Sequence, residues 1–295
     1  MTMKIAIITD EVSQDLDQVL AFAREFSLDG LEIRSLWNKL PHELTDEEAA
    51  RIKEGAAEAG LAICGVATPV LKCDVEKDGE IPGQVDCLRK SLRRAEEWGA
   101  PMIRTFTGWR TKEPQKVFPR AVEVYREHLL PVIEGSSVFL GVENEFSTNV
   151  ATGAESREFL SLLDSPRAKL VWDPCNILYL PDFSDPFEEN FPAVRDLIGH
   201  VHVKDAVRTD GKKEAPAESV ALGDGGARLL DNLKALHADG YRGWISLETH
   251  WRLQQQLDEG VTRSPKGESF SSGAEPASRE CMKRLKQWLS ELDGK

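Results

Sequence analysis

The chain has 295 residues, 41% of them hydrophobic and 29% charged, which provides enough apolar material for a sizeable core and excludes a disordered chain. Its 50 acidic and 37 Lys and Arg residues give a formal net charge of −13, which disfavours nucleic acids and anionic membranes as partners. No apolar run is long enough to cross a bilayer, and the start MTMKIAIITDEV lacks the features of a signal peptide. The five cysteines form no CxxC pair, so we expect reduced thiols in a cytoplasmic protein.

Short apolar runs recur along the whole chain, each followed by a loop and an amphipathic stretch. The runs are continuous rather than alternating, which is typical of parallel strands buried on both faces. They predict eight strands, at residues 4–9, 30–33, 62–67, 102–106, 138–143, 169–173, 200–204 and 244–248.

The amphipathic stretches between these runs predict helices. Thr45 with Glu48 three residues later is a capping-box signature for the start of the second helix. Glycine commonly ends a helix, and Gly60, Gly99, Gly135 and Gly240 stand where a helix would end before the next strand. The other predicted helices cover residues 16–26, 84–98, 116–133, 155–163, 187–197, 228–238 and 276–292.

Eight β-then-α units predict an α/β fold, a (β/α)8 TIM barrel that forms a single domain over residues 1–295. The alternative, a doubly wound open sheet, would need a glycine-rich turn after the first strand, and TDEVSQD is not one. Two connections are long, residues 68–83 after strand three and 249–275 after strand eight. Both follow strand C-termini, so we expect them to cover the mouth of the barrel. They could equally form a dimer interface, so a homo-oligomer is an alternative to a monomer.

Four residues at the ends of successive strands stand out as metal ligands, because strand C-termini in a barrel point into one mouth. Three carboxylates close together would repel one another in a water-poor cavity, and a divalent cation removes that repulsion. Three oxygens and one imidazole nitrogen suit Mn²⁺, Mg²⁺ or Co²⁺, with Zn²⁺ as a further candidate. The alternative is that these polar residues only cap strands against solvent. The four are Glu143, Asp173, His202 and Glu248.

Strand seven has two further polar residues on the face of His202, because side chains alternate along a strand. We expect the deeper His200 to be a core histidine. Lys204 is expected to hold a phosphate, a carboxylate or a substrate oxygen, or else to form a salt bridge with Glu143, Glu145 or Asp205. Together with Lys204, the predicted substrate-binding residues at strand ends are Asn176, Arg104, Glu145 and His250.

The segment ALGDGG, residues 221–226, precedes the seventh predicted helix and admits two interpretations. Its glycines could cradle a phosphate at the start of the helix. The charge of Asp224 would repel that anion, so a tight turn is the favoured interpretation.

Seven segments in this order resemble the sugar phosphate isomerase/epimerase family, the xylose isomerase-like TIM barrels: TDEVSQD, GLEIR, GVEN, WDPCN, HVHVKDA, ALGDGG and ISLETHW. The resemblance implies one divalent metal ion on Glu143, Asp173, His202 and Glu248. In ketose epimerases of the family the two glutamates also exchange protons with carbon, which makes Glu143 and Glu248 the catalytic pair. Those enzymes have a substrate-binding His three residues after the ligand Asp, whereas this chain has Asn176 there. HVHVKD also resembles inosose dehydratases, in which the lysine after the metal histidine contacts substrate.

We therefore expect a metal-dependent enzyme of carbohydrate metabolism, an isomerase or epimerase acting on a sugar, a sugar phosphate or a cyclitol. It would work through an enediolate, with glutamates as acid and base. The alternative is a lyase of the inosose dehydratase type, whose first step is the same. Less favoured are a non-catalytic sugar-binding barrel and an apurinic-site endonuclease. Those endonucleases bind several zinc ions through many more histidines, whereas three of the six histidines here, His42, His128 and His237, fall outside strand ends.

Overall fold

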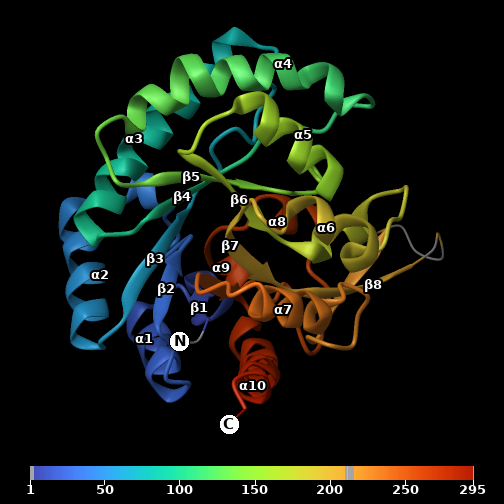
Figure 1. Ribbon diagram of the computed structural model, residues 1–295. Helices are drawn as coiled ribbons and strands as arrows, with labels where there is room; N and C mark the ends of the chain where they lie inside the picture. Colours follow the sequence, from blue (N-terminus) through green and yellow to red (C-terminus); the bar gives the residue numbers. More distant parts are fainter. Residues whose placement is uncertain (1–2, 210, 212–215, 295) are drawn as a thin grey trace.

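The computed structural model describes residues 3–209, 211 and 216–294. Eight parallel strands form a closed barrel in the order β1-β10-β7-β6-β5-β4-β3-β2, with helices around it (Figure 1). This confirms the predicted (β/α)8 barrel. The strands are β1 (Lys4–Ile8), β2 (Gly30–Ile33), β3 (Ala62–Ala67), β4 (Met102–Thr105), β5 (Phe139–Glu143), β6 (Ala168–Trp172), β7 (Ile198–Val203) and β10 (Trp244–Leu247).

Except at 116–133 and 187–197, the helices begin and end close to the predicted positions. The capping box is present, since the Thr45 hydroxyl accepts from the Glu48 amide at 3.2 Å and the Glu48 carboxylate accepts from the Thr45 amide at 2.8 Å. The four predicted terminal glycines have φ angles between +68° and +78°, which side chains with a Cβ rarely adopt. The helices are α1 (Leu16–Glu25), α2 (Asp46–Glu58), α3 (Ile81–Trp98), α4 (Pro114–Val124), α5 (Gly153–Leu163), α6 (Phe191–Val194), α7 (Leu229–Ala238), α8 (Glu259–Arg263), α9 (Gly267–Ser271) and α10 (Ala274–Leu292).

Two stretches that were predicted as continuous helices are α-helical over only part of their length. The stretch 116–133 leaves α-helical geometry after Val124 and continues as a π-turn (Tyr125–Leu129) and a 3-10 turn (Leu130–Ile133). The stretch 187–197 is a π-turn (Pro186–Asn190) followed by the short α6. Pro131 and Pro192 lie in these stretches, and proline has no amide hydrogen with which to continue an α-helical ladder.

The pairing of β7 with β10 places polar side chains on one face of the sheet and apolar side chains on the other. His202 pairs with Ser246, and Val201 pairs with Ile245. Side chains alternate along a strand, so His202 and Ser246 lie inside the barrel while Val201 and Ile245 face the helices. The interior therefore holds buried polar groups, and the main apolar core lies between strands and helices.

A two-stranded antiparallel sheet follows β7 and was not predicted: β8 (Asp205–Arg208) pairs with β9 (Ala217–Val220). The Asp205 carboxylate accepts from the amides of Gly223, Gly225 and Ala227 at 2.8, 3.1 and 3.0 Å. A Cβ on Gly225 would lie 2.1 Å from Asp205 Oδ1, so only glycine fits there. The amides of the ALGDGG turn thus bind an internal carboxylate.

The two long connections meet over the mouth of the barrel. Lys72, in the 68–83 connection, donates through Nζ to the Arg263 carbonyl at 2.5 Å. The 249–275 connection contains α8 and α9, which sequence patterning did not predict. It is anchored to the first strand end, because the Ser271 hydroxyl donates to the Asp10 carbonyl at 3.0 Å.

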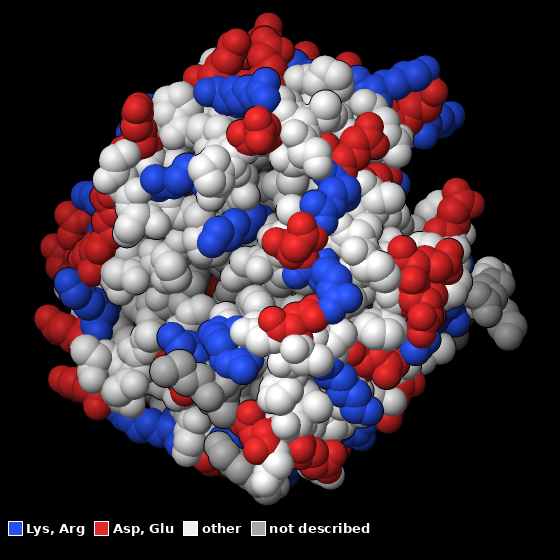
Figure 2. Space-filling view, in the orientation of Figure 1, with Lys and Arg blue, Asp and Glu red and all other residues white. Residues whose placement is uncertain are grey.

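The surface carries charged side chains of both signs, and the cysteines, all of which the structure describes, form no disulfide bonds. Basic and acidic side chains are interspersed over the face seen in Figure 2. All five cysteines are buried free thiols. Within the described residues, no helix is both long and apolar enough to cross a membrane.

Candidate metal centre

Four side chains that the sequence places at strand ends meet at one point inside the mouth. Glu143 ends β5, Asp173 follows β6, His202 lies near the end of β7 and Glu248 follows β10. One ligand atom from each lies within 4.8 Å of the others, and all four residues are buried. The Nδ1 atom of His202 is 3.5 Å from Glu143 Oε1 and 3.7 Å from Glu248 Oε2.

Buried polar atoms at this point lack hydrogen-bond partners within the described chain, as expected for ligands of a cation. Among the described residues, the buried His202 Nδ1 has no hydrogen-bond partner, and Glu143 Oε2 has only its ion pair with Arg104 Nη1 at 3.2 Å. Leaving a buried polar atom unpaired costs about 1–3 kcal/mol. A divalent ion would accept a lone pair from each of these atoms, and the three carboxylates and one imidazole match the ligand preferences of Mn²⁺, Mg²⁺, Co²⁺ and Zn²⁺.

Glu32, on β2, orients the histidine. Its carboxylate lies 3.1 Å from His202 Nε2 and 3.0 Å from His200 Nε2, and His200 Nε2 also lies 2.8 Å from the Ser246 hydroxyl. An ionised carboxylate only accepts hydrogen bonds, so His202 carries a proton on Nε2 and turns Nδ1 toward the other three candidate ligands. Sequence analysis did not assign Glu32 a role. The sequence did contain a clue to this role. Glu32 stands two residues before Arg34, so both charged side chains lie on the same face of the strand.

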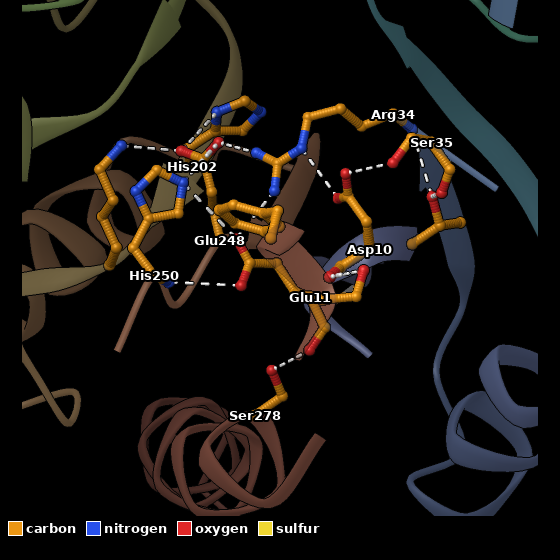
Figure 3. A network of polar contacts seen from close by, with 12 residues as sticks. Asp10, Glu11, Arg34, Ser35, His202, Glu248, His250 and Ser278 are labelled. Atoms are coloured by element: carbon orange, nitrogen blue, oxygen red, sulfur yellow. Dashed lines mark hydrogen bonds and ion pairs between the residues drawn. The ribbon is translucent and has the colours of Figure 1, made fainter. Parts of the chain in front are cut away.

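Arg34 holds the carboxylate of Glu248 by the oxygen that Lys204 does not contact (Figure 3). Its guanidinium donates to Asp10 Oδ1 at 2.8 Å, Glu11 Oε1 at 3.0 Å and Glu248 Oε1 at 2.5 Å, with every partner buried. Arginine presents several donors in a rigid plane, so this network holds Glu248 in one orientation. Asp10, Glu11 and Arg34 thus form a buried charged network that contacts Glu248 through its Oε1 atom.

The charges of the site shift the pKa values of its ligands strongly. Burial alone would raise the pKa of Glu143, but Arg104 and His202 outweigh it and lower that pKa to about 2. Burial raises the pKa of Asp173 to about 6 despite the neighbouring Lys204. Burial would lower the pKa of His202, but Glu32 and Glu143 outweigh it and raise that pKa to about 10. The metal-free protein therefore holds a protonated His202 at neutral pH.

Lys204 occupies the centre of the acidic cluster. Its ammonium pairs with Asp173 Oδ2 and lies 2.7 Å from Glu248 Oε2. The salt bridge considered from the sequence was to Glu143, Glu145 or Asp205, and that choice of partners is wrong. The side chain reaches inward rather than sideways, so it meets the carboxylates of the two strands on either side of β7.

All five predicted substrate-binding residues line one pocket together with Glu143 and Glu248. The cavity measures about 20 Å³, which holds about one water molecule. Arg104 Nη1 lies 3.2 Å from Glu143 Oε2. The wall includes further side chains that the sequence did not single out: Lys72, Phe106, Phe146, Tyr179 and Pro265.

Asn176 and His250 each present an unsatisfied atom in this region. Asn176 donates through Nδ2 to Glu143 Oε1 at 3.3 Å, while its buried Oδ1 has no partner among the described residues. His250 Nε2 likewise has no hydrogen bond in that part of the chain and lies 3.5 Å from Glu248 Oε1. Both atoms therefore have unused hydrogen-bonding capacity.

Solved structures with this fold span nearly the whole chain. D-allulose 3-epimerase from Methylomonas sp., in complex with D-allulose, has a TM-score of 0.70 at 17% identity and covers 97% of each chain. The IOLI protein with a bound zinc atom has a TM-score of 0.73 at 16% identity, covering 98% of this chain and 99% of that one. The probable 3-DHS dehydratase AsbF of Bacillus anthracis, involved in petrobactin synthesis, has a TM-score of 0.71 at 18% identity, covering 96% and 99%.

At these identities the structural similarities show the fold alone. No curated protein matches the sequence. The sequence does match a family model, described as xylose isomerase-like TIM barrel, over residues 20–285. That match covers most of the chain and agrees with the resemblance found in its strand-end motifs, so the protein belongs to the xylose isomerase-like TIM barrel family.

Proposed function

We propose that this protein is a divalent-metal-dependent isomerase or epimerase of sugars or cyclitols. The observation that carries the proposal is the convergence of Glu143, Asp173, His202 and Glu248, with the unpaired Nδ1 of His202 directed at the carboxylates. The fold shared with D-allulose 3-epimerase and with the zinc-containing IOLI protein supports it.

The residues of the pocket suit proton transfer at a carbon beside a carbonyl. A bound divalent ion would polarise the carbonyl and the neighbouring hydroxyl, which acidifies the hydrogen on the carbon between them. Glu143 and Glu248 come from strands that are not neighbours in the barrel, so they approach the substrate from different sides. One removes the proton and the other returns it.

The remaining groups of the pocket would hold the substrate and its developing charge. Lys204 and Arg104 are cations beside the two glutamates and would stabilise negative charge on the substrate oxygens. Asn176, Glu145 and His250 line the same cavity and would bind substrate hydroxyls. Asn176, which stands where ketose epimerases of the family have histidine, supplies an amide oxygen as acceptor instead of an imidazole.

A dehydratase is the second candidate, supported by the fold shared with AsbF and by Lys204 in the pocket. It would begin with the same proton abstraction and then expel a hydroxyl group from the next carbon as water. Lys204 would donate a proton to that hydroxyl group, which then leaves as water.

Metal analysis and NMR in D₂O test both candidates. We expect one divalent ion per chain in the wild-type protein and none in Asp173→Ala, with Asp86→Ala on the exposed face of α3 as the matched control. The protein is then incubated with ketoses and inososes. Deuterium entering a substrate without water loss supports an isomerase or epimerase, and water loss supports a dehydratase. A protein that binds no divalent ion would contradict the proposal.

A further inference from the structure

The candidate pocket contains a cation, Lys72, that the proposed chemistry does not use. Lys72 belongs to the 68–83 connection rather than to a strand, yet its side chain is only 8% exposed and lines the same cavity as Glu143 and Glu248. Its Nζ lies 4.5 Å from the centroid of the Phe106 ring. A lysine is rarely buried to this degree without a partner for its charge.

The hydrogen-bonding capacity of Lys72 is only partly used. An ammonium group has three N–H donors. Within the described part of the chain, the Arg263 carbonyl at 2.5 Å is its one hydrogen-bond acceptor. The nearest carboxylate oxygen, Glu145 Oε1, is 4.0 Å away, and Glu145 Oε2 accepts from the Ser147 amide and hydroxyl at 3.0 and 2.5 Å. Burial lowers the pKa of Lys72, as expected for incompletely compensated charge.

The balance of charge in the pocket changes when a divalent ion is present. The cations are Lys72, Arg104 and Lys204. Against them stand Glu145 and the three carboxylates among the candidate ligands. A divalent ion would cancel two of those four negative charges. The ion would take over part of the compensation that the cations provide, and of these three cations Lys72 lies farthest from a carboxylate oxygen, at 4.0 Å.

We propose that the substrate carries an anionic group, a carboxylate or a phosphate, and that Lys72 binds it. This inference rests on the proposed function and narrows its substrate class to acidic or phosphorylated sugars. The Phe106 ring and the Arg263 carbonyl hold the ammonium in place. The anion would accept hydrogen bonds from the N–H groups of Lys72 that the Arg263 carbonyl leaves unused. The cavity of about 20 Å³ is too small for a sugar, so we infer that the pocket widens when a substrate binds.

Three ketoses that differ at one carbon test the proposal: D-fructose, D-fructuronate and D-fructose 6-phosphate. Their dissociation constants are measured by calorimetry on the Mn²⁺-loaded protein. We expect at least one charged ketose to bind about tenfold more tightly than D-fructose, the factor that corresponds to about 1.4 kcal/mol for a charge-assisted hydrogen bond. The stronger of the two charged ketoses identifies carboxylate or phosphate as the group.

Matched variants assign that preference to Lys72. Lys72→Met should keep its manganese and lose the preference for the charged ketose, measured as the ratio of the two dissociation constants for D-fructose and the charged ketose. Lys72→Arg should keep that preference. Lys116→Met, which removes an exposed lysine from α4, should behave like the wild type.

Two results would overturn the inference. One is the absence of any preference for the charged ketoses, including no binding by all three. The other is an equal loss of affinity for all three in Lys72→Met, which would mark Lys72 as a contact between loops only. A protein that holds manganese and exchanges deuterium into D-fructose as readily as into the charged ketoses would retain the proposed function and lose this inference.

Discussion

The carboxylate of Glu32 lies 3.1 Å from Nε2 of His202, across the barrel interior from β2 to β7. Both residues are fully buried. This contact holds the Nε2 proton and the orientation of the imidazole, so the position of the candidate ligand atom Nδ1 depends on a residue that does not itself face the ligand cluster.

Glu32→Gln should weaken metal binding by about 10–100-fold, the usual effect of removing a partner that orients a metal-bound histidine. The amide keeps the shape but lacks the charge that favours a proton on Nε2. Competition with a fluorescent metal indicator measures the change. Glu58→Gln, at an exposed position of α2, is the control. Unchanged metal affinity in Glu32→Gln would show that the imidazole is positioned by packing instead.

Glu143→Gln and Glu248→Gln should each retain appreciable metal and lose at least about 100-fold in turnover, the lower range for general acid–base catalysis. Glutamine keeps an oxygen for the metal but cannot accept the substrate proton. Turnover is followed by NMR and metal content by elemental analysis. Near-normal turnover in both variants, with metal bound, would exclude the glutamate pair and direct attention to Lys204 and His250.

Metal affinity should rise with pH. The pKa of His202 in the metal-free protein is about 10, and a metal ion binds only the neutral imidazole, so binding below that pH displaces one proton. The apparent affinity then increases about tenfold per pH unit between pH 7 and 9. Below about pH 6 the protonation of Asp173 adds a second displaced proton and steepens the dependence. Calorimetry in buffers of different ionisation enthalpy counts these protons, and a count of zero at pH 8 would contradict the assignment of His202.

Lys204→Met should destabilise the metal-free protein by about 3–5 kcal/mol, because the buried charges of Asp173 and Glu248 lose their shared cation. A divalent ion would compensate the same carboxylates, so added Mn²⁺ should raise the melting temperature of this variant more than that of the wild type. Thermal unfolding with and without Mn²⁺ measures both effects. Lys90→Met, which removes an exposed i,i+4 pair with Asp86, is the control and should show the wild-type response. If Mn²⁺ raised the melting temperature of Lys204→Met and of the wild type equally, Lys204 would not share its carboxylate partners with the metal ion.

The amino-acid sequence by itself determined the barrel and the set of candidate ligands. Continuous apolar runs followed by amphipathic segments specify buried parallel strands with covering helices. A barrel brings all strand C-termini to one mouth, so Glu143, Asp173, His202 and Glu248 could be grouped from their places at strand ends alone. The same logic grouped Arg104 and Lys204 with them.

The tertiary structure alone decided which groups orient and complete the site. Glu32 and His202 are 170 positions apart, and no local period encodes their contact. Lys72 enters the pocket from a loop, where side-chain direction follows no regular repeat. The partners of Lys204 depend on the distance between neighbouring strands inside the barrel. Local patterns fix which face a side chain takes on its own element, whereas contacts between distant elements are set by how the closed barrel packs.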